Sequence, residues 1–427
     1  MSIAELYCVF QEHPFVSTDS RNIPASCIFF ALKGDNFDGN KYAVDALSKG
    51  ASFAVVDDSG VVTNSRFILV DDVLSTLQQL ALHHRRTLNI PILAITGSNG
   101  KTTTKELIAS VLKKNYCVTY TKGNLNNHIG VPLTILQITR QTDIAVIEMG
   151  ANHPHEIDFL CKIAEPDYGL VTNIGKAHLE GFGSFEKVIQ AKSELYNYLR
   201  EHKGKTFVNA DNDLLVKQSA GIEQLTYGTN NNAQLQGKAE EDAWFLAARV
   251  LFSDGWLCLQ SKLIGDYNLG NILAAIRVGL YFNIEPVAIQ QAIAVYEPNN
   301  NRSQLIEKNS NKIIMDAYNA NPTSMAAALD NFEKIKHQHK IVILGDMLEL
   351  GEYTMEEHQK IADKLNSIDL EKVFLIGQQF EQITSNAIKF PSVEILIKHM
   401  INRPIRNSLV LIKGSRGIGL EKTIEFI

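Results

Sequence analysis

Cysteine is scarce in this chain, and none of its five cysteines is spaced for a metal site or a redox pair. Cys8, Cys27, Cys117, Cys161 and Cys258 lie far apart in the sequence, whereas zinc and dithiol motifs need pairs a few residues apart. Isolated thiols of this kind are typical of a reducing compartment. We therefore expect a cytoplasmic protein in which each cysteine is buried.

The chain also lacks a leader peptide, a long apolar run and an excess of positive charge. Its first six residues contain no basic region followed by an apolar core. No apolar run approaches the roughly 20 residues of a membrane span. The formal net charge is -6, so the chain lacks the excess of positive charge that is typical of proteins that bind nucleic acid. We therefore expect no signal peptide, no membrane span and no nucleic-acid partner.

Short apolar strands that alternate with helical patterns predict an α/β protein of several domains. The chain has 427 residues, of which 45% are hydrophobic and 21% charged, so it is globular and too long for one ordinary domain. Three blocks follow one another: a small α/β domain over 1–87, a central domain with a mostly parallel sheet over 88–299, and a C-terminal Rossmann-like domain over 300–427. The predicted strands are Ile28–Leu32, Phe53–Val56, Phe67–Val70, Ile92–Ile95, Ile144–Ile147, Leu170–Thr172, Ile313–Met315, Ile341–Leu344, Val373–Ile376 and Leu409–Ile412, and the predicted helices include Tyr42–Ser48, Val73–Arg86 and Phe185–Leu199.

The glycine-rich segment Thr96–Thr104 predicts a phosphate-binding loop, because it follows an apolar strand and precedes a helix. Glycines let backbone N–H groups approach phosphate oxygens, and the helix N-terminus adds its positive dipole. We expect Lys101 at the β- and γ-phosphates and the Thr102 hydroxyl on Mg²⁺. The loop is shorter than the general motif, since Ile95 stands five residues before Gly100. The alternative is a chance glycine turn before a helix. The residues expected to bind ATP here are Gly97, Ser98, Asn99, Gly100, Lys101, Thr102 and Thr103.

A carboxylate and an imidazole stand close to the carboxyl ends of neighbouring strands. Glu148 ends an apolar strand before a glycine turn, and Mg²⁺ favours one or two carboxylates beside phosphate oxygens. The alternative for Glu148 is a local cap or ion pair, and the nearby phosphate loop favours the metal. His178 also follows a strand, and for this residue a structural hydrogen bond and a functional role both remain open.

Lys192 falls in the middle of the apolar stripe of the helix Phe185–Leu199. A buried ammonium is costly unless it is paired or functional. The alternative is a lysine that extends along apolar neighbours to the surface. Spacing alone does not decide between these two interpretations.

Further polar residues stand in the later part of the chain. Asn268 and Asn271 lie three apart on one face of a helix, where they could read a purine edge or cap the helix start. Arg302 and Asp316 could close onto a nucleotide held by the central block, and the alternative for Asp316 is a surface turn.

Two later loops, 344–350 and 413–416, also follow strands. In the second loop, Lys413 and Arg416 could receive a carboxylate, the arginine in bidentate fashion. The alternative is ordinary loop charge, and this is the interpretation that we adopt for Glu349 in the first loop.

Taken together, these motifs resemble those of the Mur ligases, the ATP-dependent enzymes that build the peptide of bacterial cell-wall precursors. The short loop T-G-S-N-G-K-T-T-T is similar to theirs. Further segments resemble the branch of the family that adds D-alanyl-D-alanine to UDP-N-acetylmuramoyl-tripeptide, and they span all three blocks. They lie at 17–21, 34–39, 121–134, 178–184, 316–325, 344–351 and 413–421.

The resemblance implies a role for each domain. The first domain would bind the UDP of the sugar substrate, the central P-loop ATPase-like domain would bind ATP, and the last would close onto both. One Mg²⁺ would be held by Thr102 and Glu148, and a second by His178 and a carbamylated Lys192. The resemblance further assigns catalysis to Lys101, His178 and Lys192, UDP binding to Ser17, Asp19, Ser20 and Arg21, adenine contacts to Asn268 and Asn271, phosphate and ribose contacts to Arg302 and Asp316, and the site of the incoming dipeptide to Asp346, Lys413, Ser415 and Arg416.

The implied chemistry forms an acyl phosphate on the tripeptide carboxylate and releases ADP and phosphate as the pentapeptide precursor of peptidoglycan forms. The implied protein acts as a monomer. Two positions depart from the family pattern: Tyr267 replaces a histidine before the first asparagine, and Asn301 replaces a glycine before the arginine. Asparagine tolerates a positive φ, so the turn at Asn301 is expected to persist. The alternatives are a sibling ligase, a ligase that adds glutamate to folate, and a catalytically silent nucleotide-binding protein.

Overall fold

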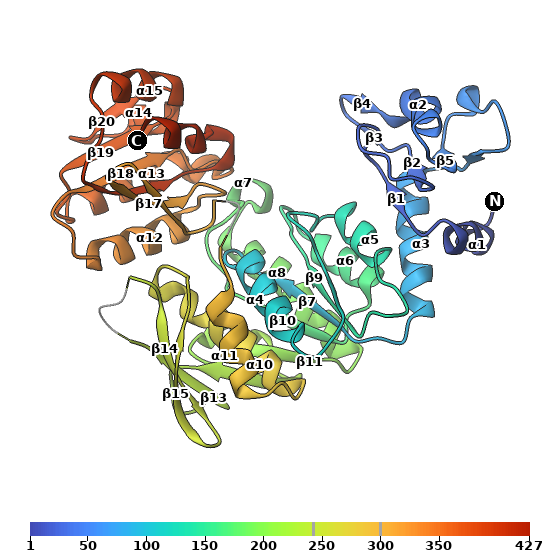
Figure 1. Ribbon diagram of the computed structural model, residues 1–427, viewed down its shortest axis with the longest axis horizontal. Coiled ribbons are helices and arrows are strands. Elements are labelled where there is room, and N and C mark those ends of the chain that lie inside the picture. Colours follow the sequence, from blue (N-terminus) through green and yellow to red (C-terminus); the bar gives the residue numbers. More distant parts are fainter. Residues whose placement is uncertain (241–243, 299–300) are drawn as a thin grey trace.

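The computed structural model describes residues 1–240, 244–298 and 301–427, and in it the chain forms three α/β units (Figure 1). The N-terminal and C-terminal units lie at opposite ends of the molecule, and the central unit lies between them. Each unit is built around its own main sheet. The α/β fold predicted from the sequence is therefore confirmed. The predicted boundary at residues 299 and 300 lies outside the described residues.

The N-terminal unit is a parallel sheet in the order β1-β2-β5-β6 with a small antiparallel ribbon, β3-β4. Ser2 and Glu5 form a capping box at the start of the first helix, and Asp72 caps the start of the last. The predicted strands and helices of this unit are confirmed to within two residues at each end. Its elements are α1 Ile3–Glu12, β1 Val16–Ser17, β2 Ile28–Phe30, β3 Lys33–Gly34, β4 Phe37–Asp38, η1 Gly39–Tyr42, α2 Ala43–Ser48, β5 Phe53–Val56, η2 Ser59–Val61, β6 Phe67–Leu69 and α3 Val73–Thr87.

Helix α3 joins the first two units, because it packs against α1 on one side and against α5 and α6 of the central unit on the other. Leu77 and Leu80 of α3 are fully buried. Near the end of the helix, Nε of Arg85 donates to the carbonyl of Ala164 at 2.9 Å, and Nη2 donates to the carbonyl of Glu165 at 2.8 Å. The helix is therefore anchored in the central unit as firmly as in its own.

The central unit holds a sheet in the order β15-β14-β13-β12-β11-β10-β7-β9-β8, parallel from β8 to β13 and antiparallel at β14 and β15. The mostly parallel sheet is confirmed, and the asparagine-rich stretch 229–232 is the turn between β12 and β13. Its elements are β7 Ile92–Thr96, α4 Lys101–Leu112, β8 Val118–Tyr120, α5 Gly130–Ile135, β9 Ile144–Glu148, α6 Glu156–Ala164, β10 Tyr168–Val171, α7 Leu179–Phe182, α8 Phe185–Glu201, β11 Lys205–Asn209, α9 Asp213–Gln218, β12 Glu223–Gly228, β13 Leu235–Ala239, β14 Ala247–Phe252, β15 Gly255–Gln260, η3 Asp266–Asn268, α10 Leu269–Tyr281 and α11 Pro286–Val295.

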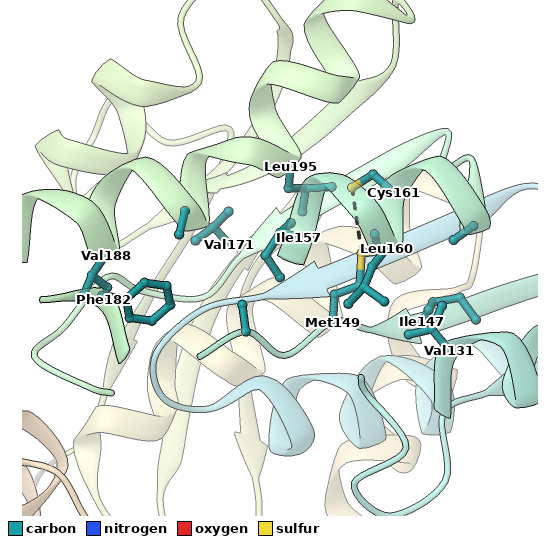
Figure 2. Close-up of a cluster of buried hydrophobic side chains, with 14 of the residues drawn as sticks. Val131, Ile147, Met149, Ile157, Leu160, Cys161, Val171, Phe182, Val188 and Leu195 are labelled. Carbon is teal, nitrogen blue, oxygen red and sulfur yellow. Dashed lines mark hydrogen bonds between the residues drawn. The ribbon is translucent and has the colours of Figure 1, made fainter. Parts of the chain in front are cut away.

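Helices cover both faces of this sheet, so every residue of β7 is buried although successive side chains point to opposite faces. In β7, Ala94 belongs to the apolar core on the side of α6 and α8, whereas Ile95 belongs to the core on the side of α4 and α10. Figure 2 shows the first of these cores, where Met149 lies beside Cys161 and the two sulfur atoms are 3.8 Å apart. This double cover fixes the carboxyl ends of β7, β9 and β10 at one edge of the sheet.

The expectation that every cysteine is buried is wrong. Cys27 and Cys161 are buried, whereas Cys8, Cys117 and Cys258 are exposed. Cys8 lies on the solvent face of α1, and Cys258 lies in β15, the edge strand of the central sheet, where the alternating pattern of burial places it outward. Thiols at such positions are accessible because no further layer covers them.

The C-terminal unit is a sheet in the order β16-β17-β21-β18-β19-β20, parallel except at the edge strand β16. The predicted Rossmann-like arrangement is confirmed in this respect. No described helix of the chain has the length and apolar character that crossing a membrane requires. The elements are β16 Gln304–Lys308, β17 Asn311–Asp316, α12 Pro322–Lys334, β18 Lys340–Gly345, η4 Gly351–Tyr353, α13 Thr354–Leu365, β19 Lys372–Ile376, α14 Gln378–Gln382, β20 Ile388–Phe390, α15 Val393–Asn402, β21 Leu409–Lys413, η5 Arg416–Ile418 and η6 Leu420–Phe426.

Candidate active site

A cavity of about 1050 Å³ lies where the three units meet. Helix α3 contributes Leu74 and Gln78 to its wall, and the central and C-terminal units contribute the rest. The cavity brings together most of the residues that the sequence singles out. Those on its wall are Ser98, Asn99, Gly100, Lys101, Thr102, Thr103, Glu148, His178, Asn268, Asn271, Arg302, Asp316 and Lys413.

The glycine-rich loop connects β7 to α4 and is held against the end of β10. Gly97 has a φ of +142°, and a Cβ atom at this position would lie 2.0 Å from Oγ1 of Thr172. The Ser98 backbone N–H donates to the carbonyl of Asn173 at 2.9 Å. Gly100 has a φ of +79° at the position just before the helix. Only glycine fits at Gly97, and the loop therefore presents the helix N-terminus to the cavity.

The side chain of Lys101 bends back over this loop. Its Nζ atom donates to the carbonyls of Gly97 at 2.6 Å and Ser98 at 3.3 Å. Burial lowers the pKa of Lys101, and nearby Arg302 lowers it further, while Glu148 acts in the opposite direction. The Lys101 ammonium is therefore held only by backbone carbonyls of its own loop among the described residues, and an anion would be a stronger partner for its charge.

Glu148 lies beside the first turn of α4. Its Oε1 atom accepts from Oγ1 of Thr102 at 3.2 Å and from Nδ2 of Asn126 at 2.8 Å. Its Oε2 atom accepts no hydrogen bond but lies 3.3 Å from Nζ of Lys105. A hydroxyl and a carboxylate side by side, next to a phosphate loop, match the oxygen ligands that Mg²⁺ takes. Within the described residues, no three His, Cys, Asp or Glu side chains cluster as a metal site.

Lys105 and Asn126 are site residues that the sequence interpretation missed. Lys105 stands one turn after Lys101 on α4 and is fully buried. Its immediate sequence neighbours do not distinguish it from a solvent-exposed lysine. A lysine between the apolar residues of a buried helix was the available signal for Lys105. Asn126 lies in the segment 121–134, one of those that resemble the Mur ligases, and this place in the sequence was the available signal.

His178 stands at the edge of the cavity against the C-terminal unit. Its Nδ1 atom lies 2.5 Å from Oε2 of Glu349, and this contact lowers the pKa of Glu349. The interpretation of Glu349 as an ordinary loop charge is therefore wrong. The contact crosses between two units, which no local sequence pattern reveals.

Lys192 points inward from α8 and is 1% exposed. The alternative in which it extends to the surface is wrong, because its Nζ atom donates to the carbonyl of Ala151 at 3.3 Å and lies 5.5 Å from the ring centre of Phe182. Burial, followed by the charge of Lys101, lowers the pKa of Lys192 to about 7. Lys192 lies behind the cavity wall that Ala151 forms and does not line the cavity itself.

The side chains of Asn268 and Asn271 form a hydrogen bond with each other at the start of α10. Nδ2 of Asn271 donates to Oδ1 of Asn268 at 2.8 Å, and Oδ1 of Asn271 accepts from Oγ1 of Thr104 at 3.0 Å. Nδ2 of Asn268 donates to the carbonyl of Ile264 at 2.8 Å, and its side chain forms no capping bond. The capping alternative is therefore not what these residues do. They tie α10 to α4 beside the phosphate loop.

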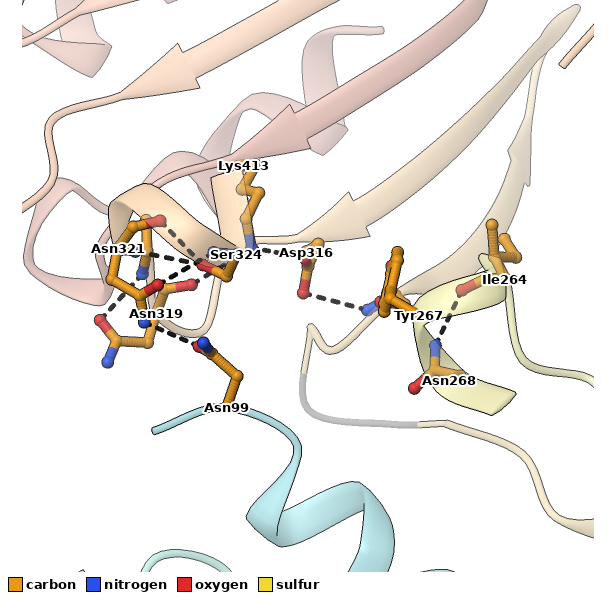
Figure 3. A network of polar contacts seen from close by, with 11 residues as sticks. Asn99, Ile264, Tyr267, Asn268, Asp316, Asn319, Asn321, Ser324 and Lys413 are labelled. Carbon is orange, nitrogen blue, oxygen red and sulfur yellow. Dashed lines mark hydrogen bonds and ion pairs between the residues drawn. The ribbon is translucent and has the colours of Figure 1, made fainter. Parts of the chain in front are cut away.

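A chain of polar contacts links the central unit to the C-terminal unit (Figure 3). The Tyr267 hydroxyl lies 2.8 Å from Oγ of Ser303, and the Ser303 backbone N–H donates to Oδ1 of Asp316 at 3.3 Å. Oδ2 of Asp316 accepts from Nζ of Lys413 at 2.5 Å. Asp316 is thus part of a network and not a free surface turn. Asn301 holds a φ of +58°, as expected for the residue that replaces a glycine.

Two side chains on the cavity wall form a second link. Nδ2 of Asn321, at the start of α12, donates to Oδ1 of Asn99 in the phosphate loop at 2.7 Å. The guanidinium of Arg302 lies 3.7 Å from the ring centre of Tyr318, and its buried Nε atom has no hydrogen-bond partner among the described residues. Such a donor is available to a ligand.

Three residues predicted near the dipeptide do not line the cavity. The buried carboxylate of Asp346 accepts from the backbone N–H groups of Gln379 and Phe380, both at 2.9 Å, at the start of α14. Oγ of Ser415 accepts from the N–H of Leu348 at 3.0 Å. The exposed Arg416 lies over the outer part of Tyr318, with 5.4 Å between its guanidinium and the ring centre.

The residues predicted to bind UDP lie at the end of β1 and in the turn that follows it, and none of them lines the cavity. Arg21 pairs with Asp19 through two hydrogen bonds of 2.9 and 2.8 Å, and these bonds lower the pKa of Asp19 to about 2. Ser17 donates to the carbonyl of Asn22 at 3.0 Å, and Ser20 is buried.

Comparison with protein families accounts for all three units. Residues 13–85 match the model of the Mur ligase family, catalytic domain, residues 95–279 match the Mur ligase middle domain, and residues 301–416 match the Mur ligase, glutamate ligase domain. The chain belongs to the Mur ligase family. The resemblance expected from the sequence motifs is confirmed.

Individual relatives match the chain over nearly its whole length. The UDP-N-acetylmuramoyl-tripeptide--D-alanyl-D-alanine ligase of Bacillus subtilis is 35% identical over 96% of this chain and 92% of its own. The ligase of the same name from Escherichia coli K12 is 32% identical with the same coverage. Among solved structures, MurF from Thermotoga maritima in complex with ADP has a TM-score of 0.85 at 29% identity and covers 96% of each chain. MurF from Acinetobacter baumannii has the same TM-score at 27% identity, over 96% of this chain and 92% of its own.

Proposed function

We propose that this protein is an ATP-dependent ligase that joins D-alanyl-D-alanine to UDP-N-acetylmuramoyl-tripeptide. The observation that carries the proposal is the similarity to ligases of that name along almost the entire chain, up to 35% identity over 96% of the residues. The site supports it, because the phosphate loop, Glu148, His178 and Lys192 are all present and lie at or behind one cavity. A catalytically silent protein would have no need for this set.

ATP is proposed to bind in the central domain, residues 88–299, against the loop from Gly97 to Thr103. The positive φ angles of two glycines and the helix start support this placement. On ATP binding, Lys101 would exchange its two backbone carbonyls for phosphate oxygens. Arg302, with its unpartnered Nε atom, would reach the phosphates from the domain over 300–427, and Asp316 would reach the ribose. Asn268 and Asn271 would lie nearest the adenine.

We further propose two Mg²⁺ sites. Thr102 and Glu148 would hold the first, and His178 with a carbamylated Lys192 the second. Only a neutral amine reacts with CO₂, and a pKa of about 7 leaves a large fraction of Lys192 neutral at physiological pH. Bound Mg²⁺ would supply neutralisation of charge on the phosphate oxygens.

In the proposed reaction, a carboxylate oxygen of the tripeptide attacks the γ-phosphorus of ATP while the bond to the bridging oxygen of ADP breaks. The product of this step is an acyl phosphate. The amine nitrogen of the dipeptide then attacks the acyl carbon, loses a proton, and phosphate leaves as the amide forms. Lys101 neutralises charge on the transferred group, and the C-terminal unit over the cavity excludes water from the acyl phosphate.

The two organic substrates are proposed to lie on either side of this centre. The N-terminal domain, residues 1–87, would bind UDP near Ser17, Asp19, Ser20 and Arg21, and the chain from UDP to the tripeptide would bring the reacting carboxylate to the cavity. The dipeptide would approach from the C-terminal unit, with Lys413 in the cavity wall and Arg416 outside it as candidate partners of its carboxylate. Asp19 and Arg21 pair with each other in that turn, 2.8 Å apart, where both side chains are open to solvent. Asp346 and Ser415 would support the dipeptide loops, because their side chains bond to backbone N–H groups.

The proposal is tested by measuring phosphate release with UDP-N-acetylmuramoyl-tripeptide and ATP while the amine is varied. We expect release to depend on D-alanyl-D-alanine. Preference for a single amino acid, or for glutamate with a folate acceptor, would replace the proposal by a sibling activity. Absence of release with every amine would favour a silent nucleotide-binding protein.

A further inference from the structure

The contact between His178 and Glu349 connects the cavity to a loop of another domain. His178 lines the cavity, whereas Glu349 follows β18 in the C-terminal unit. The buried Nδ1 atom of His178 lies 2.5 Å from Oε2 of Glu349, a close contact whose angle falls outside that of a hydrogen bond. Since Nδ1 is engaged in this way, Nε2 is the ring nitrogen that remains for a ligand in the cavity.

The surrounding backbone is built to hold this contact. The N–H of Glu180 donates to the carbonyl of Glu349 at 3.1 Å, directly beside the side-chain pair. His178 and Glu349 have φ values of +53° and +64°. Both are non-glycine residues in the left-handed region, a conformation that persists only where the surroundings impose it and that clusters at functional sites.

Two further contacts make the interface wider than the pair of His178 and Glu349. Nζ of Lys176 lies 2.9 Å from Oε1 of the buried Glu357. The backbone N–H of Lys176 donates to Oγ1 of Thr323 at 3.3 Å. The segment that carries His178 is therefore bound to the C-terminal unit both before and after this residue, through Lys176 and Glu180. The position of the imidazole depends on how that unit is docked.

We propose that Glu349 is a positioning residue that fixes the ring of His178 from the C-terminal domain, so that Nε2 is presented to the cavity only while the two domains are docked here. This inference rests on the proposed function for the identity of the ligand, and on the contacts alone for the positioning. A histidine that binds a ligand through one ring nitrogen commonly donates the other N–H to a carboxylate, which sets its tautomer and orientation. Here that carboxylate comes from a different domain. The imidazole is therefore oriented for a ligand only when the C-terminal domain is docked.

The test compares Glu349→Gln with Glu352→Gln, an exposed glutamate three residues along the same loop. In protein labelled with ¹⁵N-histidine, the ring signals of His178 are assigned by their loss in His178→Gln. We expect Glu349→Gln to shift the Nδ1 and Nε2 signals of His178 and Glu352→Gln to leave them unchanged. Unchanged His178 signals in Glu349→Gln overturn the proposal, whatever happens to the rate.

The rate supplies the second criterion. We expect kcat to fall by about 10- to 100-fold in Glu349→Gln, the range typical of carboxylates that orient a ligand-binding histidine, with the KM for ATP little changed. A Mn²⁺ titration of the same variants should show weaker binding in Glu349→Gln only. Shifted signals with an unchanged kcat overturn the functional part. If the native chain shows no ligation, the proposed function fails separately, and the signals and the titration still decide the role of Glu349.

Discussion

The ammonium of Lys105 lies 3.3 Å from Oε2 of Glu148, and both side chains are buried. Lys105 stands four residues after Lys101, so both lysines lie on the same face of α4. Lys101 lines the cavity, whereas Lys105 contacts the carboxylate of Glu148. The second lysine places a positive charge beside Oε2 of Glu148, while Thr102 and Asn126 donate hydrogen bonds to its other carboxylate oxygen. The carboxylate is therefore fixed before any cation arrives.

Replacing Lys105 by Met should destabilise the protein, because it leaves the buried Glu148 without a counter-charge. Removing one partner of a buried pair costs about 3 to 5 kcal/mol. Urea unfolding measures the loss. Lys114→Met, at an exposed position just beyond the same helix, is the control and should change stability by less than about 0.5 kcal/mol. Equal stabilities of the two variants would contradict the pairing.

Replacing Lys101 by Ala should lower kcat/KM for ATP by about 100-fold or more, the size of effect seen when a preorganised charge at a reacting group is removed. Steady-state phosphate release gives this value. The overall fold should remain, because Lys101 bonds only to carbonyls of its own loop. A variant with unchanged ATP-dependent ligation would show that the loop is not the phosphate site.

Lys192→Met should be more stable than the native chain in CO₂-free buffer at pH 6, and this advantage should shrink as the pH rises. The pKa of Lys192 is lowered from 10.5 to about 7 in the folded state. Below pH 7 both states carry the proton, so the folded state bears the full cost of a buried charge. Between 7 and 10.5 the folded state releases the proton first, and the native chain gains stability with pH.

Thermal unfolding at pH 6, 8 and 10 measures this convergence, with Lys187→Met on the exposed face of the same helix as control. A stability difference that is constant with pH would contradict a neutral buried amine. Added ¹³C-bicarbonate should produce a carbamate signal in the native chain that Lys192→Met lacks. No such signal at neutral pH would exclude the carbamylated form.

Tyr267→Phe and Ser303→Ala should each raise the KM for ATP about fivefold, which corresponds to the roughly 1 kcal/mol of one hydrogen bond. The hydroxyl contact of 2.8 Å links the domains beside the nucleotide site, and each substitution removes it. The double variant should be no worse than either single one. Tyr116→Phe, whose hydroxyl bonds to Phe282 within the central unit, is the matched control. Additive effects of Tyr267→Phe and Ser303→Ala would show that the two hydroxyls act separately.

The strands predicted from the sequence lie within two residues of observed ones, but three of them end one residue early at the site, and β8 and the strands from β11 to β15 were not predicted. Three of them were predicted to stop at Ile95, Ile147 and Ile412, whereas β7, β9 and β21 continue to Thr96, Glu148 and Lys413. Apolar periodicity locates the part of a strand that is covered by helices. The last residue of each strand still pairs with the neighbouring strand, and Glu148 and Lys413 also line the cavity. All three last residues are polar, so the apolar pattern does not include them.

The contacts that complete the site could not be predicted in the same way. Glu349 and His178 are far apart in the chain, and their meeting depends on how two domains dock. The Tyr267 hydroxyl finds Ser303 for the same reason. Local residue types identify the phosphate loop because strand, glycines and helix are contiguous, whereas charge pairs across an interface are set by tertiary structure alone.

Helix α3 determines which part of this chain can fold independently. Its inner face covers α5 and α6, and Arg85 bonds to the end of α6. A fragment that begins after Thr87 would expose the apolar surface beneath this helix, whereas a fragment that begins at Asp72 would keep both that surface and the helix cap. The smallest autonomous nucleotide-binding fragment therefore includes a helix that chain order places in the neighbouring domain.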